Sequence, residues 1–247
     1  MGRMELAEES LIRRAIADRR TLRGLHLLYP APRIVEVLSN LRLDFLYLDG
    51  EHGCFSGAEL AQHAALAESL GMTPIARVPD NTRAAITHFL DRGLRGIVVP
   101  HVESEADARR AVAATYFAPL GDRSYGGAFP QGQDKRGLEA FLLQCNARVT
   151  LSVMIESGAG LAAVDAIARV EGVDYLTFGM MDLAQQLGRP GRPDHPDVQE
   201  AVKAASARIR AAGKAVREDF MRFAWIDDLV YAGGLATIGK PEGPAGD

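Results

Sequence analysis

The chain has 247 residues, of which 47% are hydrophobic, and its formal net charge at pH 7 is −4. This length fits a single α/β barrel domain, while the mild acidity and the scattered arginines argue against nucleic acid or an anionic membrane as a partner. No apolar run approaches the roughly 20 residues of a membrane-spanning helix, and two cysteines are too few for a disulfide framework. We therefore expect a cytoplasmic protein with one domain over residues 1–239 and a disordered tail over residues 240–247.

Short apolar runs alternate with helical patterns along almost the whole chain. Residues 4–20 carry apolar side chains at helical spacing among charges, which predicts an amphipathic helix that packs as a lid or plug ahead of the main fold. Strands are then predicted over residues 22–29, 45–48, 73–78, 96–102, 149–155, 173–178, 214–216 and 235–238. Helices are predicted over residues 32–41, 57–70, 82–92, 105–116, 161–170, 196–212 and 220–231.

This strict alternation is typical of parallel strands joined by helical crossovers. Eight such units predict a (β/α)8 barrel, the TIM-barrel fold. An open doubly wound sheet is the structural alternative, but no Gly-x-Gly-x-x-Gly follows the first predicted strand. Residues 119–136 form a long, glycine-rich insertion of the kind that covers sites or contacts subunits. Residues 240–247 cannot form the helix that should close the barrel, which predicts an atypical, truncated C-terminus.

Charged side chains follow several predicted strands at the point where each strand ends. Asp49-Gly50-Glu51-His52-Gly53 comes after the second strand, where the glycines permit a sharp turn and Asp49 is close enough to orient the His52 imidazole. The other strand ends carry Arg77, Glu156, Asp182 and His101, the last interpreted as a polar rim residue. Because the carboxyl ends of barrel strands converge on one face, these residues are the candidates for chemistry.

Glu156 and Asp182 end adjacent strands, so their carboxylate oxygens can meet at one point. Two hard oxygen ligands with room for water suit Mg²⁺, Mn²⁺ or a similar octahedral cation, and Gly179 lets the backbone approach a ligand beside it. Each acid also has a simpler interpretation, as the N-cap of the next helix. Arg77 ends a buried strand and needs an anionic partner, either an internal acid or a substrate carboxylate.

The chain carries a long series of short motifs: Asp49-Gly-Glu-His-Gly, Ala76-Arg-Val-Pro, Leu90-Asp-Arg-Gly, Gly96-Ile-Val-Val-Pro, Met154-Ile-Glu-Ser, Gly172-Val-Asp, Gly179-Met-Met-Asp-Leu, Leu187-Gly-Arg-Pro-Gly and His195-Pro-Asp-Val. In this order and spacing they resemble the HpcH/HpaI family of class II, metal-dependent pyruvate aldolases, of the 4-hydroxy-2-oxoheptanedioate aldolase type. The resemblance covers residues 22–214, which is most of the chain.

The resemblance implies a TIM barrel in which Glu156 and Asp182 bind a divalent metal cation, Mg²⁺, Mn²⁺ or Co²⁺. Its small-molecule partners would be a 2-oxo acid of the pyruvate or oxaloacetate type and an aldehyde. The implied reaction is the (retro-)aldol cleavage of a 4-hydroxy-2-oxo acid through a metal-stabilised pyruvate enolate. The resemblance also implies a homo-oligomer, a hexamer built as a trimer of dimers.

Catalytic roles follow from the same resemblance. His52 would be the base, with Asp49 and Asp91 orienting it, since a histidine that titrates near neutrality can take the 4-hydroxyl proton and return one to the enolate. Arg77 would stabilise the enolate oxygen, where negative charge develops as the bond breaks.

The chain departs from the family pattern in three places. Met154 stands where the family has a glutamine two residues before the metal glutamate, and Gly179-Met180-Met181 stands where the family has Gly-Pro-Ala. The backbone at Gly179 and Met181 is implied to bind the substrate carboxylate, and Met154 to line the same pocket. The seventh strand is altered, and the closing helix, which the family exchanges between subunits, is predicted to be absent. The sequence therefore leaves the aldehyde partner and the assembly open.

Other functions were weighed against this one. A Schiff-base aldolase needs a lysine inside a barrel strand, but Lys135, Lys203 and Lys214 are misplaced, and only Lys240 follows a predicted strand. An acyl-CoA lyase of the related barrel would want a basic groove for the nucleotide phosphates. Decarboxylation of oxaloacetate, or other enolate chemistry, would use the same site. A non-catalytic scaffold leaves the converging charged cluster unexplained, because such a cluster costs stability.

Overall fold

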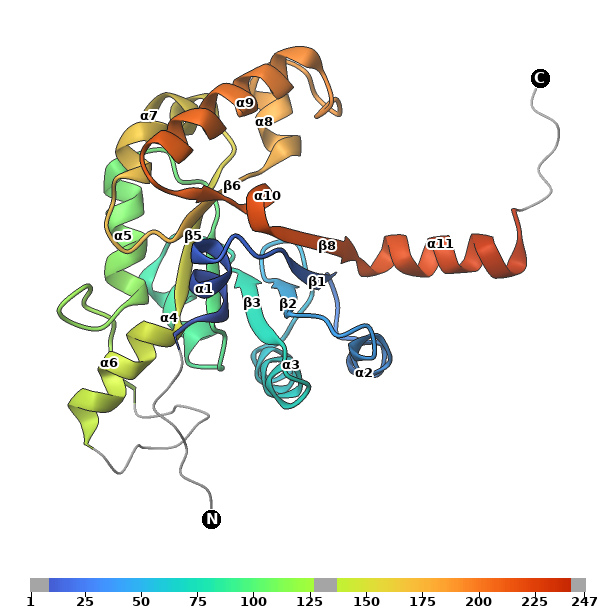
Figure 1. The fold of residues 1–247 in the computed structure, drawn as a ribbon, viewed down its shortest axis with the longest axis horizontal. Helices are drawn as coiled ribbons and strands as arrows, with labels where there is room; N and C mark the ends of the chain where they lie inside the picture. The colour runs from blue at the N-terminus through green and yellow to red at the C-terminus, as the bar shows by residue number, and fades with distance from the viewer. Residues whose placement is uncertain (1–8, 127–136, 241–247) are drawn as a thin grey trace.

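A curled sheet of eight parallel strands forms the centre of the molecule (Figure 1). The computed structural model describes residues 9–126 and 137–240. The strands are β1 Leu22–Leu27, β2 Phe45–Asp49, β3 Thr73–Arg77, β4 Gly96–Val99, β5 Thr150–Ile155, β6 Tyr175–Phe178, β7 Ala215–Val216 and β8 Met221–Trp225. They lie in the order β7-β6-β5-β4-β3-β2-β1-β8, and all hydrogen-bonded neighbours are parallel. The predicted (β/α)8 fold class is confirmed.

Helices alternate with the strands and cover the outside of the sheet. They are α2 Pro32–Ser39, α3 Gly57–Ser69, α4 Arg83–Leu90, α5 Glu105–Thr115, α6 Leu138–Arg148, α7 Gly158–Ala168, α8 Met180–Gln186 and α9 Pro196–Ala211. N-cap side chains start several of them, including Ser56, Thr82, Ser104 and Ser157, each accepting a backbone N–H. Helices α6 and α8 were not predicted from the sequence. Helix α6 follows the glycine-rich insertion, of which residues 127–136 lie outside the described part. Among the described residues, no helix is long and apolar enough to cross a bilayer.

Alternation along each strand separates an outer core from an inner one. On β2, Leu46 and Leu48 pack among the helices, whereas Phe45 and Tyr47 face the inside of the barrel with Tyr175. Asp49 continues the inward set, and its side chain is fully buried. The period of two therefore directs a carboxylate into the interior at the carboxyl end of β2.

The barrel is open between β7 and β8. Only α10, residues Arg217–Phe220, joins these strands, and they lie at opposite edges of the hydrogen-bonded sheet. A crossover between parallel neighbours needs about a dozen residues, so four cannot bring β7 and β8 into register. The short connection explains why β8 pairs with β1 while β7 pairs with β6.

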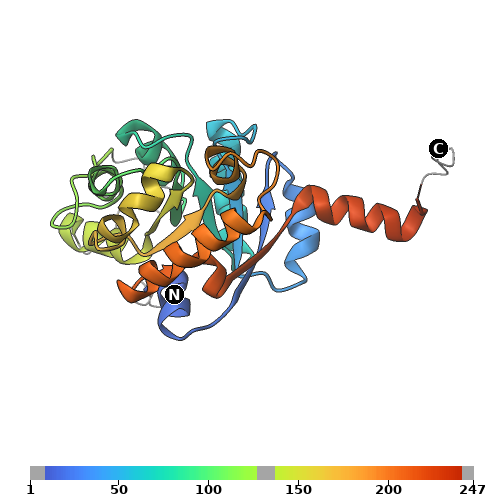
Figure 2. The same cartoon turned by 90° about the horizontal axis from the view of Figure 1, so that it is seen from above.

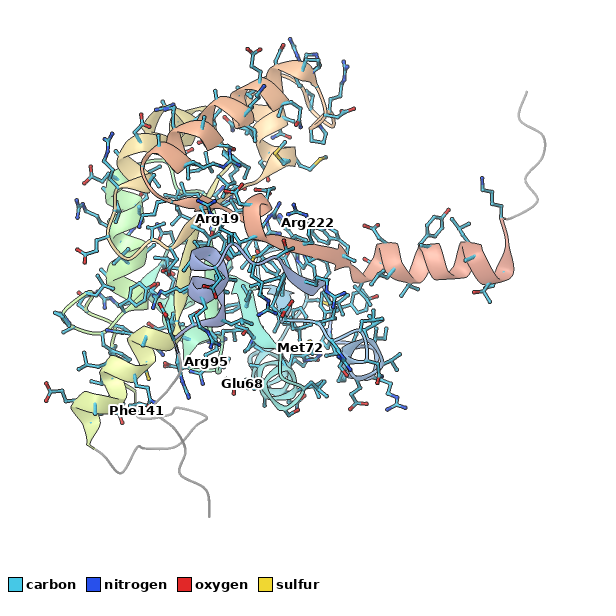
Figure 3. All side chains as sticks on the ribbon, viewed as in Figure 1. Arg19, Glu68, Met72, Arg95, Phe141 and Arg222 are labelled. Atoms are coloured by element: carbon cyan, nitrogen blue, oxygen red, sulfur yellow. The ribbon has the colours of Figure 1, made fainter. Side chains whose placement is uncertain are left out.

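The predicted C-terminal elements are wrong. Residues 221–225 form β8, and residues 226–238 form one helix, α11 (Ile226–Ile238), where a helix over 220–231 and a strand over 235–238 were predicted. The alternation at Phe223 and Trp225 is a strand pattern, and the apolar run 235–238 is the last turn of α11. The closing helix, expected to be absent, is therefore present. It projects from the body in both views (Figures 1 and 2), and Figure 3 shows its side chains with no other element over them. The predicted tail lies outside the described residues except for Lys240.

Helix α1 (Leu11–Ala17) is shorter than the helix predicted over residues 4–20, of which residues 4–8 lie outside the described part, and it plugs the amino-terminal end of the barrel. Its residues Ile12 and Ala15 are buried against the inner core. Arg13 fixes it in place: Nε donates to Asp174 Oδ1 at 2.7 Å, and Nη2 donates to the carbonyl of Val149 at 2.7 Å. Both partners directly precede strands, β6 and β5, so α1 is tied to the end opposite the strand ends that carry the candidate site.

Replacement of Arg13 by alanine is expected to lower the free energy of unfolding by about 2–4 kcal/mol, because it leaves the Asp174 carboxylate short of its charged partner. Urea unfolding measures the loss. Arg33→Ala is the matched control, because the Arg33–Glu36 pair is exposed and should contribute less than about 1 kcal/mol. Equal effects of the two changes would contradict the plug assigned to α1.

Candidate active site

The carboxyl ends of β2 and β3 carry a buried ion pair. Asp49 and Arg77 are register partners on these strands. Arg77 donates Nε to Asp49 Oδ1 at 3.1 Å and Nη2 to Oδ2. The backbone N–H groups of Glu51 and His52 donate to the same Oδ1 at 3.0 and 3.1 Å. Burial by itself would raise the pKa of Asp49, but the hydrogen bonds and the charge of Arg77 outweigh it and hold that pKa well below its ordinary value. Arg77 therefore has an internal acid as its anionic partner.

Glu51 and His101 connect this pair to the next acid around the rim. Glu51 Oε2 lies 3.0 Å from Arg77 Nη1, and Glu51 Oε1 lies 3.0 Å from His101 Nε2. The other ring nitrogen of His101, Nδ1, lies 3.0 Å from Glu156 Oε1. The result is a continuous row of charged and polar side chains from Asp49 to Glu156.

Glu156 is the buried acid of the site, 4% exposed at the end of β5. Burial raises its pKa above the ordinary value; the backbone N–H and the charge of His101 oppose this rise, and the nearby charges of Glu51 and Asp182 add to it. Its Oε2 lies against the backbone of Gly179, where a Cβ would come within 2.3 Å of it, so only glycine fits there. The carboxylate thus sits in a tight place with an excess of negative charge around it.

The N-cap interpretation of the two acids is wrong. Ser157, and not Glu156, caps α7, and Asp182 lies in the first turn of α8, whose N-cap position is Gly179. The described residues hold no group of three or more His, Cys, Asp or Glu side chains arranged to bind a metal ion. The carboxylates of Glu156, which is buried near other acids, and Asp182 could still supply two ligands to a cation. Water and substrate would then occupy its other coordination positions.

The structure places His52 three residues after β2 and Asp91 at the C-cap of α4, before β4 begins. The His52 side chain is exposed. Its backbone bonds Asp49, as described above, and Asp91 accepts from Arg123 Nη2 at 2.7 Å. Asp49 and Asp91 thus each have an arginine as partner. Their predicted role, to orient the His52 imidazole, stays a prediction. The two side chains differ in burial, since His52 is exposed and Asp49 is fully buried.

The methionines expected to line the pocket differ in position. Met154 is buried on β5, two residues before Glu156, and packs with Tyr47 and Tyr175 in the inner core. Met181 is 57% exposed at the start of α8. Only Met154 therefore belongs to the barrel interior in this structure.

His26 lies next to Asp49, although no motif in the sequence indicates a role for it. It is 3% exposed inside the barrel, where its ring stacks on Trp225 at 3.8 Å between centroids. Its Nε2 lies 3.5 Å from Asp49 Oδ2, and burial lowers its pKa below the ordinary value. The available signal was its place in β1: it alternates with outward-facing Leu25 and Leu27, as inward-facing strand residues do.

A parallel α/β barrel with acids and an arginine at the carboxyl ends of its strands is the architecture of a barrel enzyme. A model of the HpcH/HpaI aldolase/citrate lyase family matches residues 23–227, and the chain belongs to this family. It is therefore a carbon–carbon lyase of the aldolase type, as the motifs predicted.

Named relatives agree with this assignment, and a solved structure shares the fold. The chain is 36% identical to the 4-hydroxy-4-methyl-2-oxoglutarate aldolase cghB of Chaetomium globosum, over 74% of this chain and 69% of that one. It is 33% identical to a 2-keto-3-deoxy-L-rhamnonate aldolase of Salmonella schwarzengrund, over 78% and 72%. The crystal structure of an HpcH/HpaI aldolase from Desulfitobacterium hafniense shares the fold, with a TM-score of 0.84 at 24% identity, over 97% of this chain and all of that one.

Proposed function

We propose that the enzyme cleaves a 4-hydroxy-2-oxo acid into pyruvate and a carbonyl product, with a divalent cation held by Glu156 and Asp182. The observation that carries this proposal is the buried Glu156 carboxylate, whose pKa is raised by burial and by the charges of Glu51 and Asp182. A cation at this point would relieve that excess of negative charge. The two relatives support the substrate class, because both of their names describe 2-oxo acids.

The bound cation would act as a Lewis acid toward the keto oxygen of the substrate. Arg77 is placed to support the same oxygen as it gains charge. A guanidinium has five N–H donors, and Arg77 gives two of them to Asp49, so donors remain for substrate. Asp49 and Glu51 hold the guanidinium in one orientation, which prepares it before substrate binds.

His52 completes the proposed chemistry as the base. Its exposed imidazole takes the proton of the 4-hydroxyl, the carbonyl product forms as the C3–C4 bond breaks, and the electron pair of that bond passes to the 2-oxo acid as an enolate. The enolate then takes a proton at C3 to become pyruvate. The proton lost from the 4-hydroxyl is balanced by the proton gained at C3, and cleavage consumes no oxidant or reductant.

The test is the cleavage of 4-hydroxy-4-methyl-2-oxoglutarate in the presence of Mn²⁺, with pyruvate detected through lactate dehydrogenase and NADH. We expect NADH oxidation that stops when EDTA is added. If no hydroxy-oxo acid yields pyruvate while oxaloacetate still loses CO2, the site performs decarboxylation and the aldol proposal is wrong.

We also infer that α11 packs against a second copy of the chain. Its apolar side chains lie in solvent: Leu229 is 38% exposed, Val230 55%, Tyr231 69% and Ile238 88%. Leaving so many apolar groups of one helix uncovered is unfavourable, and the helix projects from the body instead of folding back onto it. A homo-oligomer, a hexamer in the family pattern, would cover it.

The double change Val230→Asp, Tyr231→Asp is expected to convert the oligomer to a monomer, because it places two charges on the face that would be buried. Light scattering after size exclusion gives the mass. Asp228→Ala, at the base of the same helix, is the matched control and should leave the mass unchanged. A monomeric wild-type protein would contradict the inference.

A further inference from the structure

His101 is held in an unfavourable backbone conformation by its contacts with two acids. Its φ is +54°, in the left-handed region that non-glycine residues seldom adopt. Such a conformation persists where surrounding interactions determine it. Three contacts do so here: the backbone N–H donates to Glu156 Oε1 at 2.6 Å, Nδ1 lies 3.0 Å from the same oxygen, and Nε2 lies 3.0 Å from Glu51 Oε1.

These contacts join the two halves of the candidate site. On one side, Glu156 is a proposed ligand of the cation. On the other, Glu51 lies against Arg77, the proposed partner of the developing oxyanion. The carboxylates of Glu51 and Glu156 repel one another, and burial adds to the cost of charge on Glu156. The His101 ring lies between them, 3.0 Å from an oxygen of each, and the backbone N–H of His101 donates to Glu156, so this residue holds the two carboxylates at a set separation.

We propose that His101 is a positioning residue that holds Glu156 ready for the cation and, through Glu51, fixes Arg77 relative to it. This inference rests on the proposed function, since it needs a cation at Glu156. It differs from the initial interpretation of His101 as a polar residue of the rim. Groups that hold a metal ligand in place typically contribute about 10- to 100-fold to metal affinity.

The first test is the binding of Mn²⁺ alone to the purified full-length protein, followed by the electron paramagnetic resonance signal of free Mn²⁺. His101→Ala and His101→Gly are each expected to bind Mn²⁺ about 10-fold more weakly than wild type. The glycine variant keeps the backbone N–H bond to Glu156 and adopts φ +54° without strain. It therefore distinguishes the effect of the imidazole on Mn²⁺ affinity from the effect of the backbone conformation. His88→Ala removes an exposed imidazole from α4 and is the matched control.

The outcomes separate the two proposals. If wild type binds Mn²⁺, Glu156→Gln does not, and both His101 variants bind as wild type does, the inference about His101 is wrong and the proposed cation site stands. If wild type binds no Mn²⁺, or Glu156→Gln binds it unchanged, the cation site fails and His101 has no cation ligand to position.

The second test examines the route through Glu51, using KM for pyruvate in the exchange of its methyl protons at saturating Mn²⁺. His101→Ala is expected to raise KM severalfold, and the double variant Glu51→Ala, His101→Ala should have the KM of Glu51→Ala alone. If the two effects multiply instead, His101 does not act on Arg77 through Glu51, and that half of the proposal is overturned.

Discussion

Glu156→Gln is expected to lower kcat by at least about 1,000-fold while leaving the fold intact. The change keeps the shape of the side chain but removes the charge that would hold the cation. A cation contributes several kcal/mol of transition-state stabilisation, and ~4 kcal/mol corresponds to about 1,000-fold in rate. Because burial and the charges of Glu51 and Asp182 raise the pKa of Glu156, its ionised form is under electrostatic stress, and the neutral amide should not lower the melting temperature.

Pyruvate formation and thermal unfolding measure the two effects on the same sample. Asp182→Asn should reduce the rate similarly, since it removes the second proposed ligand, while Glu200→Gln, an exposed change on α9, should change neither quantity. Activity of Glu156→Gln within about tenfold of wild type, or an activity insensitive to EDTA in wild type, would contradict the cation site.

Arg77→Ala is expected to damage both stability and catalysis. It leaves the fully buried Asp49 carboxylate without its bidentate partner, and breaking a buried pair in this way costs about 3–5 kcal/mol. It also removes the guanidinium that supports the developing oxyanion, which is worth about 100- to 1,000-fold in kcat. Arg77→Lys keeps the charge but cannot make the two parallel bonds to Asp49, so an intermediate loss is expected.

The double variant Arg77→Ala, Asp49→Asn distinguishes the two effects. Removing the unpaired charge should recover much of the lost unfolding free energy, measured in urea, but none of the lost kcat. Equal stability of Arg77→Ala and wild type would show that the Asp49 charge does not depend on Arg77. Recovery of activity in the double variant would remove Arg77 from the chemistry.

Most of the barrel could be predicted because its signals are local. Buried parallel strands are short apolar runs, and the helices between them carry their own caps, as Ser56 and Glu59 do for α3. Local signals did not predict the end of the chain. Phe220 to Tyr231 has enough apolar residues for a helix, yet Phe223 and Trp225 pair with β1, and only that long-range pairing decides their state.

The candidate site was predictable to the extent that parallel strands place their ends together. Arg77, Glu156 and Asp49 were found from that rule, and the structure brings them onto one connected rim. Their mutual contacts were not predictable. His101 bonds Glu51 across 50 positions of sequence and Glu156 across 55, and both bonds depend on the paths of two loops. His26 could not be found in this way, because it lies inside a strand and does not follow the end of one.

The most direct test of the central claim is proton NMR of pyruvate in D2O with the purified enzyme. We expect the C3 methyl signal to disappear with Mg²⁺ present, to persist with EDTA, and to disappear again when Mg²⁺ is restored, because the enzyme forms the enolate only with a cation at Glu156 and Asp182. A methyl signal that persists with every metal would contradict enolate formation at this site, and with it the proposed lyase chemistry on pyruvate.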